Sequence, residues 1–383
     1  MRILIEILAF LLIFSSCLSF FTVFSVAKED SDPSISARAF CLIDAESKHI
    51  LYGKNENVRM PMASTTKIMT AIIAIESKIT FSNQICTPKQ AVGIEGSSIY
   101  LSEEEKISFE ALLYGLLLSS ANDAATAIAI TVAGSEEAFV DLMNKKAISL
   151  GLENTHFANP HGLFDENHYS TARDLALLMA YCMQNESFAL ISGCSKKVFP
   201  KSDDGTRVMI NHNKLLGYNI GVIAGKTGYT KKSGRCLVSC AKRDKLTLVC
   251  ATLNAPDDWN DHQELYDFGF NHYKRINFDA IELNIPLVSG KSSSILAASS
   301  DISLLLPQYY SEVDIVIEAP QFLFAGLSKG DEIGRVVYLY GSKTLATSPL
   351  ILCEDAPKTE YGFNPFEWLI NLFKKLKEIL WIA

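Results

Sequence analysis

The sequence predicts an α/β protein: an antiparallel sheet flanked by helices plus a helical subdomain, followed by a small all-β domain and a C-terminal amphipathic helix. Three observations predict this class. Runs with helical spacing occupy much of residues 64–183, three strand-like runs joined by tight polar turns follow at 221–253, and beyond residue 276 short alternating runs are separated by Gly, Ser and Pro. With 383 residues, 48% of them hydrophobic, the chain is too long for one ordinary domain and can bury a large core.

The first 27 residues are typical of a secretory signal peptide. A positive charge at Arg2 precedes an apolar stretch at residues 7–14, and Ser25-Val26-Ala27 forms a small-x-small cleavage site. An uncleaved membrane anchor is the alternative, because apolar character continues over residues 3–26, a length that can span a bilayer. Both interpretations predict that the body of the protein is exported.

The order of elements follows from hydrophobic periodicity. Residues 37–43 and 50–52 alternate around a turn and predict a β-hairpin at one edge of a sheet. From Ser64 the chain is apolar on every face, as expected of a helix buried through a domain centre. A turn is expected at residues 119–123, where Ser, Asn and Asp interrupt helical spacing. Further helices are expected at residues 109–118, 124–132, 136–150, 171–183 and 262–273, with a loop at 154–170.

The second half of the chain is predicted to be rich in strands. Antiparallel strands are expected at residues 221–230, 235–241 and 245–253, and the strands of the small β domain at 280–285, 303–307, 313–318 and 332–340. The last stretch, from Pro365 to Ala383, has one polar and one apolar helical face; its three lysines favour an interfacial helix over a spanning one. The predicted divisions are a signal peptide at 1–27, a large α/β domain at 28–275, a small β-sandwich at 276–356 and an amphipathic anchor helix at 357–383.

Charge and cysteine content exclude some classes. A formal net charge of −8 and the lack of a clustered basic stripe argue against nucleic-acid binding. Eight cysteines remain after the signal peptide, and because a large core needs no disulfide framework, most are expected to be buried small hydrophobes. One disulfide bond remains possible, because Cys236 and Cys240 are expected on one face of a strand and Cys250 on its hairpin partner.

A Ser-x-x-Lys pattern begins at Ser25, Ser64 and Ser239, and only Ser64 opens a long helical run. If Ser64 begins a buried helix, Lys67 lies one turn further along the same face, where its amine can approach the Ser64 hydroxyl. Burial lowers the pKa of a lysine, so that it can act as a base, and the N–H groups of a helix N-terminus can stabilise an oxyanion. The alternative is an N-cap serine followed by a surface lysine.

Two further motifs follow in the order that an active-serine acyltransferase requires. Ser120 and Asn122 are two residues apart in an expected extended turn, so both side chains can face one cleft, as proton relay and carbonyl ligand. In Lys226-Thr227-Gly228, the glycine lets a substrate backbone approach a strand, while the other two offer charge and a hydroxyl to an anionic group. Taken singly, these motifs also fit a helix-capping turn and a Gly-interrupted edge strand.

The ordered set resembles that of penicillin-recognising active-serine enzymes, and is most similar to the D-alanyl-D-alanine carboxypeptidases, the low-molecular-mass penicillin-binding proteins. The stretches Asn159-Pro160-His161-Gly162-Leu163 and His168-Tyr169-Ser170-Thr171-Ala172 extend the resemblance over nearly the whole chain after the signal peptide. It implies a β-lactamase/transpeptidase-like fold. It also implies that the β domain is a stalk and the last helix a membrane anchor.

The resemblance assigns a role to each motif residue. It implies that Ser64 is the acylated nucleophile, Lys67 its base and Ser120 a proton shuttle. Asn122 would bind a substrate amide, and Lys226 and Thr227 the terminal carboxylate. The strand at Gly228 would admit the substrate, and the backbone N–H groups of Ser64 and Tyr229 would form the oxyanion hole. Several relatives also use an Arg near the start of the following helix, where this chain has the acidic stretch 257–262, and no substitute for that Arg is evident from the sequence.

These inferences predict an enzyme on the outer face of the bacterial cytoplasmic membrane, removing the terminal D-Ala from peptidoglycan stem peptides through Ser64, which penicillins would also acylate. The alternatives are a class A-like β-lactamase, for which Glu166 is the candidate water-activating residue, and a non-catalytic β-lactam sensor or wall-binding protein. No cofactor or metal is expected, because none of the seven histidines forms an H-E-x-x-H pair and the acidic stretch lacks a twelve-residue Ca²⁺ loop.

Overall fold

The computed structural model describes residues 32–201, 205–310 and 312–359, with residues 366, 369–370 and 372–374 near the C-terminus. The predicted signal peptide at 1–27 and most of the predicted anchor helix at 365–383 lie outside the described residues. Among the helices that are described, none combines the length and the apolar character needed to cross a bilayer.

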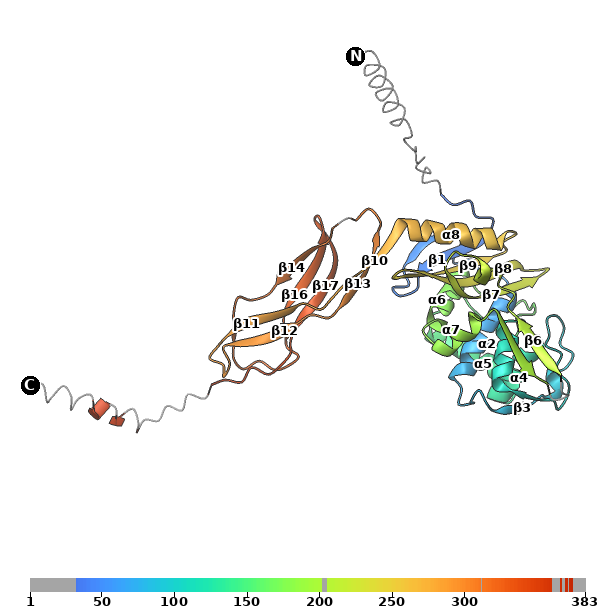
Figure 1. Ribbon diagram of the computed structural model, residues 1–383, viewed down its shortest axis with the longest axis horizontal. Coiled ribbons are helices and arrows are strands. Elements are labelled where there is room, and N and C mark those ends of the chain that lie inside the picture. Colours follow the sequence, from blue (N-terminus) through green and yellow to red (C-terminus); the bar gives the residue numbers. More distant parts are fainter. Residues whose placement is uncertain are drawn as a thin grey trace, which may run out of the picture. The chain divides into compact units, whose positions relative to one another are not determined.

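A five-stranded antiparallel sheet is the frame of the N-terminal domain (Figure 1). The strands lie in the order β2, β1, β9, β8, β7, and every neighbouring pair is antiparallel. Their bounds are β1 Ala39–Asp44, β2 Ile50–Lys54, β7 Val222–Thr230, β8 Gly234–Arg243 and β9 Leu246–Leu253. The predicted hairpin and the three predicted adjacent strands are confirmed, with β2 and β7 at the two edges.

Strand β1 shows why this sheet is apolar on both faces. Phe40 and Leu42 belong to the core beneath α8 (Asp258–His272), whereas Cys41 and Ile43 belong to the core shared with α6 (Ala172–Cys182). Successive side chains of a strand point to opposite faces, so a strand covered by helices on both sides has no position left for a solvated residue. All six residues of β1 are buried.

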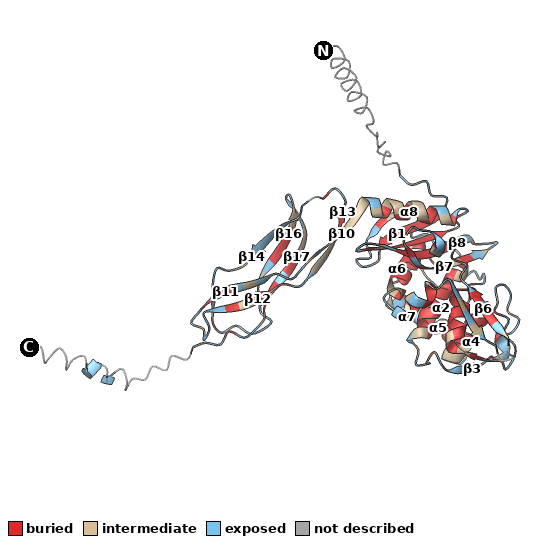
Figure 2. Ribbon diagram, in the orientation of Figure 1, coloured by how far each residue is buried: buried red, intermediate tan, exposed pale blue. Residues whose placement is uncertain are grey.

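Helix α2 (Lys67–Glu76) is the centre of the helical subdomain, as predicted. Eight of its ten residues are buried, which accounts for its uniform apolar sequence (Figure 2). It contacts α6 and four other helices, namely α3 Phe109–Leu117, α4 Asn122–Ala133, α5 Glu136–Ser149 and α7 Glu186–Ser192. Because helices surround it, residues at either end of α2 are held in fixed positions relative to the subdomain.

Short polar side chains set where the helices begin. The hydroxyls of Ser108, Ser135 and Thr171 each accept a hydrogen bond from the backbone N–H three residues later, at the starts of α3, α5 and α6. Helix α4 ends at Gly134, whose φ of +86° is the left-handed conformation favoured at a helix C-terminus. Helix α8 begins at Asp258, four residues before the predicted start.

Two hairpins of the subdomain were not predicted, since their strands are short and mostly solvated. They pair β3 (Gln84–Cys86) with β4 (Lys106–Ser108), and β5 (Lys196–Pro200) with β6 (Thr206–Ile210). Arg207 ties them together: its guanidinium is buried and pairs with Glu105 at 2.8 Å.

The C-terminal strands form a small domain of their own, as expected. A six-stranded sheet has the order β14, β16, β17, β12, β11, β15, and β10 (Tyr273–Phe278) pairs separately with β13 (Ile302–Pro307). The other bounds are β11 Glu282–Val288, β12 Ser294–Ala298, β14 Asp314–Glu318, β15 Leu323–Phe324, β16 Glu332–Tyr340 and β17 Lys343–Leu352. Strands β10, β12, β15 and β17 were not predicted, and β10 crosses the predicted boundary at 275/276.

All eight described cysteines are free thiols. Cys236 and Cys240 lie in the core on the α6 side of the sheet, whereas Cys250 lies in the core on the α8 side. The bridge left open by the sequence is therefore excluded by strand geometry, because the partners face opposite sides. Burial raises the pKa of Cys236 to about 11 and that of Cys240 to about 12, which keeps these thiols protonated.

We expect Gly193→Ala to lower the free energy of unfolding by about 1–3 kcal/mol, the usual cost of overpacking. A Cβ at Gly193, where α7 ends, would lie 2.4 Å from the carbonyl oxygen of Ile223 in β7, and backbone cannot yield cheaply. The matched control is Gly217→Ala, whose Cβ would meet nothing within 4 Å. Denaturant unfolding of both variants is the measurement, and equal midpoints would contradict this packing argument.

Candidate active site

Ser64 lies in a single 3₁₀ turn, Ala63–Thr66, that leads directly into α2. The sequence predicted the start of an α-helix, and the tighter turn replaces it because Thr65 closes back on the carbonyl of Met62 through both its backbone N–H and its hydroxyl. Lys67 is the first residue of α2, and its Nζ lies 2.9 Å from Ser64 Oγ. The predicted pairing of nucleophile and amine is therefore present.

The Lys67 amine is buried and has two further partners. Its Nζ lies 2.7 Å from Asn122 Oδ1 and 2.5 Å from the carbonyl oxygen of His161. Burial, with a smaller contribution from the charge of nearby Lys226, holds the pKa of Lys67 well below its ordinary value. A neutral amine has two N–H donors and one lone pair; when the two carbonyl oxygens accept both donors, the lone pair is left to accept from the Ser64 hydroxyl.

Ser120 and Asn122 do not share an extended turn, which corrects the prediction for this segment. Ser120 has a left-handed backbone with φ +57°, and Asn122 is already the first residue of α4. Their side chains still meet the other motifs, although by different routes. Asn122 Oδ1 accepts from Lys67, while Ser120 Oγ accepts from the Lys226 ammonium at 3.0 Å. A left-handed serine is strained, and such strain is commonly kept at functional sites.

Lys226, on the edge strand β7, is as deeply buried as Lys67. Its Nζ donates to Ser120 Oγ and, at 2.8 Å, to the carbonyl oxygen of Thr227. Burial lowers the pKa of Lys226 from 10.5 to about 7. Ser120 thus lies next to an amine that exchanges its proton near neutral pH, which is the property a proton relay needs.

Asp123 organises the rim of the site, a role that no sequence motif indicated. Its carboxylate accepts from the backbone N–H groups of Ile99 and Leu101 and from the Ser98 hydroxyl. Next to it, Asn122 Nδ2 donates to the carbonyl oxygen of Glu95. Adjacent residues at the start of α4 thereby fix the loop before β4, while Asn122 also holds Lys67.

A buried relay supports the turn that carries Ser64. His168 Nδ1 accepts from the backbone N–H of Ala158, so its Nε2–H donates to Thr66 Oγ1, and the Thr66 hydroxyl donates to the carbonyl of Ala63. Burial lowers the pKa of His168 to about 3, so the ring is neutral. Ala63 has a φ of +48°, and a Cβ on Gly162 would lie 2.1 Å from its carbonyl oxygen. The strained residue before the nucleophile is therefore held on both sides.

Gly228 brings β7 against the same turn. A Cβ at this position would lie 3.0 Å from the backbone nitrogen of Ser64 and 3.1 Å from the carbonyl oxygen of Met62. The sequence analysis expected the glycine to admit a substrate, and its close neighbour is in fact the Ser64 turn. The missing side chain lets the two backbones approach, and Ser64 and Tyr229 line the same cleft.

A cleft of about 300 Å³ opens at this point. Five predicted site residues line it, namely Ser64, Ser120, Thr227, Gly228 and Tyr229. The other three, Lys67, Asn122 and Lys226, are buried and reach the lining serines or one another through hydrogen bonds. Five lining residues were not predicted: Ser97, His212, Arg235, Asp258 and Trp259. Only the hairpin spacing of β7 and β8 could have pointed to Arg235, since it faces Tyr229 across the two strands.

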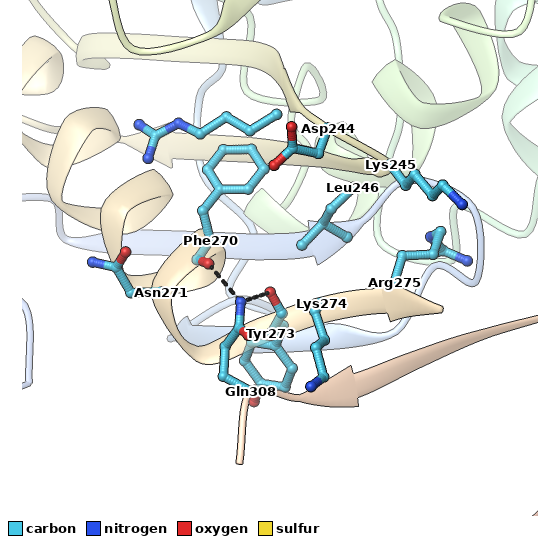
Figure 3. Close-up of a pocket in the computed structure, with 10 residues that line it drawn as sticks. Asp244, Lys245, Leu246, Phe270, Asn271, Tyr273, Lys274, Arg275 and Gln308 are labelled. Atoms are coloured by element: carbon cyan, nitrogen blue, oxygen red, sulfur yellow. Dashed lines mark hydrogen bonds between the residues drawn. The ribbon is translucent and has the colours of Figure 1, made fainter. Parts of the chain in front are cut away.

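A larger hollow of about 440 Å³ lies elsewhere, where α8 runs into β10 (Figure 3). None of the predicted site residues lines it. Gln308 crosses it and donates to the carbonyl oxygens of Phe270 and Tyr273. The Ser-x-x-Lys pattern at Ser239 is also no site: the Ser239 hydroxyl is buried between His262 Nδ1 and the Tyr266 hydroxyl, 2.7 Å from each.

The three sequence motifs thus meet at one cleft, on a sheet whose edge strand faces a helical subdomain. This combination defines the protein as an active-serine enzyme of the penicillin-recognising class. The profile of the D-alanyl-D-alanine carboxypeptidases, peptidase family S11, matches residues 26–257, more than half of the chain. The chain belongs to this family.

Individual relatives agree with that assignment. The chain is 33% identical over 352 residues to D-alanyl-D-alanine carboxypeptidase DacF of Bacillus subtilis, covering 88% of this chain and 90% of the relative. It is 31% identical to the carboxypeptidase DacC of Escherichia coli over 96% of this chain and 94% of the relative. Among solved structures, penicillin binding protein 5 from Haemophilus influenzae superposes with a TM-score of 0.73 at 28% identity, covering 86% of this chain and 99% of that one.

The low pKa of Lys226 makes a prediction about stability and pH. Between the folded value of about 7 and the ordinary value of 10.5, the unfolded chain binds more protons at this residue than the folded chain does. The free energy of unfolding should therefore rise as the pH increases through this window. We expect Lys226→Met to have a smaller rise than the wild type between pH 7 and about 9.5, measured by denaturant unfolding at each pH. The control Lys245→Met, at an exposed position, should keep the wild-type profile; a parallel Lys226→Met profile would contradict the assignment.

Proposed function

We propose that this member of the D-alanyl-D-alanine carboxypeptidase family removes the terminal D-Ala from peptidoglycan stem peptides through an acyl-enzyme on Ser64, and that penicillins acylate the same residue. The observation that carries the proposal is the Lys67 amine, buried 2.9 Å from Ser64 Oγ, with two carbonyl oxygens accepting its N–H groups. In that arrangement the amine is a base aimed at one hydroxyl.

Acylation begins when Ser64 Oγ attacks the carbonyl carbon of the penultimate D-Ala and its proton passes to Lys67. Negative charge then develops on the substrate oxygen. The backbone N–H groups of Ser64 and Tyr229 would stabilise it, which the close approach of Gly228 to the Ser64 turn supports. The side chain of Asn122, shared between Lys67 and the rim of the cleft, would bind the substrate amide.

The leaving group must be protonated as the C–N bond breaks. Ser120 would donate its hydroxyl proton to the D-Ala nitrogen and recover a proton from Lys226, whose Nζ lies 3.0 Å from Ser120 Oγ. The near-neutral pKa of Lys226 suits this exchange, because proton transfer is most efficient when the donor pKa is near the working pH. Free D-Ala leaves, and the rest of the peptide remains as an ester on Ser64.

Before the second step, Lys67 would pass the proton it took from Ser64 to Lys226, which restores both amines. Water then hydrolyses the ester: neutral Lys67 accepts the water proton and returns it to Ser64 Oγ as the ester C–O bond breaks. A class A-like β-lactamase would use a carboxylate for this step. Glu166, the candidate from the sequence, is exposed and does not line the cleft. Among the described lining residues the one carboxylate is that of Asp258, which accepts from Arg235. These observations favour the carboxypeptidase and predict slow loss of a penicilloyl ester.

We propose that the enzyme acts at the outer face of the cytoplasmic membrane. The support is the signal-like composition of residues 1–27 and the two-faced pattern of Pro365 to Ala383, with Phe373 on the apolar face and Lys374 on the polar one. A family member acting on a fixed wall polymer would benefit from an interfacial anchor.

The test of the reaction is intact-protein mass spectrometry of the purified protein with penicillin over time, beside D-Ala release from an acyl-D-Ala-D-Ala peptide. We expect a long-lived adduct that is lost in Ser64→Ala, together with D-Ala release by the wild type alone. Rapid adduct loss with penicillin consumed and no D-Ala released would instead identify a β-lactamase. A stable adduct without peptide turnover would identify a sensor.

The test of the anchor is deletion of residues 360–383. Removing an amphipathic helix removes buried apolar area and basic side chains from the lipid interface, so the truncated protein should leave the membrane fraction while keeping peptide turnover. Fractionation followed by a D-Ala assay is the measurement, with cleavage after residue 27 verified by N-terminal sequencing. If the truncated protein stays on membranes after the signal peptide has been removed, the anchor proposal is wrong.

A further inference from the structure

The sequence assigned Lys226 and Thr227 to the substrate's terminal carboxylate but offered no substitute for the additional Arg that several relatives place there. We propose that Arg235, on strand β8, binds that carboxylate together with Thr227, and thereby restricts the enzyme to peptides that end in a free carboxylate. This inference rests on the proposed function, and it concerns a residue outside the three motifs.

The register of the sheet puts Arg235 on the required side. Strand β8 pairs with the edge strand β7 so that Arg235 lies opposite Tyr229. Residues opposite each other in an antiparallel pair share a face, and Thr227, two residues from Tyr229, shares it as well. All three line the cleft that contains Ser64. A carboxylate hydrogen-bonded to the Thr227 hydroxyl therefore lies on the same face of the sheet as the guanidinium.

Asp258 holds the guanidinium of Arg235 in place and leaves some of its N–H groups available to a ligand. The Nε of Arg235 donates to Asp258 Oδ1 at 2.8 Å, its Nη2 lies 2.8 Å from the same oxygen as an ion pair, and the guanidinium lies 5.6 Å from the ring centroid of Trp259. A guanidinium has five N–H groups, and in the described part of the chain no other acceptor lies within hydrogen-bond distance of this one. The side chain of Arg235 is 43% exposed, whereas that of Asp258 is 3% exposed. The carboxylate thus fixes the arginine from behind, and donors remain for a ligand.

Lys226 is less suited to this task than the motif pattern implied. Its side chain is buried, it does not line the cleft, and its Nζ already donates to Ser120 and to the carbonyl of Thr227. Moving it to a carboxylate would break the link to the proton relay. The planar guanidinium of Arg235 matches the two oxygens of a carboxylate in geometry, which the single ammonium of a lysine does not.

A cation at this place selects for the end of a peptide. The terminal D-Ala carboxylate carries a full negative charge, which a guanidinium binds strongly. An internal peptide bond at the same position presents only a neutral amide. Charge-assisted hydrogen bonds are about twice as strong as neutral ones, enough for about ten- to hundredfold discrimination. We therefore expect exopeptidase activity to exceed endopeptidase activity, with Arg235 responsible for the difference.

The experiment compares an acyl-D-Ala-D-Ala peptide with the same peptide amidated at its C-terminus, using the purified full-length protein. The wild type should prefer the free acid. In Arg235→Gln the KM for the free acid should rise about tenfold or more with kcat changed much less, while turnover of the amide stays the same. Arg235→Lys should recover part of the preference, which a variant damaged in folding would not do.

Arg243→Gln is the matched control. Arg243 lies on the same strand, pairs with Asp267 at 2.9 Å and stacks over Phe270, but lines the hollow between α8 and β10. It should keep the wild-type preference. An active wild type whose preference for the acid survives Arg235→Gln would overturn this inference alone. A wild type that releases no D-Ala from either peptide would overturn the proposed function and this inference with it.

Discussion

The contact between the buried Lys67 amine and its three oxygen partners is the constraint on which the rest of the structure depends. Ser64 Oγ, Asn122 Oδ1 and the His161 carbonyl come from a 3₁₀ turn, the start of α4 and a loop, and they converge only because α2 is enclosed by helices. An amine without such partners would be costly to bury, and one in water would stay charged. Fold and reactivity are therefore set by the same packing.

Close backbone approach is the second theme of this site. Gly162 meets the carbonyl of Ala63, Gly228 meets the Ser64 turn, and both Ala63 and Ser120 adopt left-handed backbones. Such conformations persist only where surrounding contacts exceed their cost, of order 1–3 kcal/mol each. The neutral ring of His168, acting through Thr66, is one of those contacts, and the two glycines are permissive because they have no side chain.

Continuous apolar runs predicted α2 and β1, because both are buried on all sides. Hydrophobic periodicity missed the β3–β4 and β5–β6 hairpins, whose strands bury little and so show weak alternation. The motifs predicted the reacting side chains but not their supports. His168, Asp123 and Arg235 act through contacts 23 to 102 residues distant in sequence, which no local pattern encodes.

The distribution of thiols gives this protein a built-in reporter of its own opening. Of eight described cysteines, Cys86 is exposed, two are half-buried and five are buried. Only a thiolate reacts with an alkylating reagent, and burial raises the pKa of Cys41 to about 12 and that of Cys250 well above its ordinary value. A pulse of reagent would therefore mark the surface cysteines first. A label on a buried cysteine would report a molecule in which the sheet had separated from α6 or α8. The rate at which each buried cysteine is alkylated therefore measures how fast that part of the core opens, without any engineered probe.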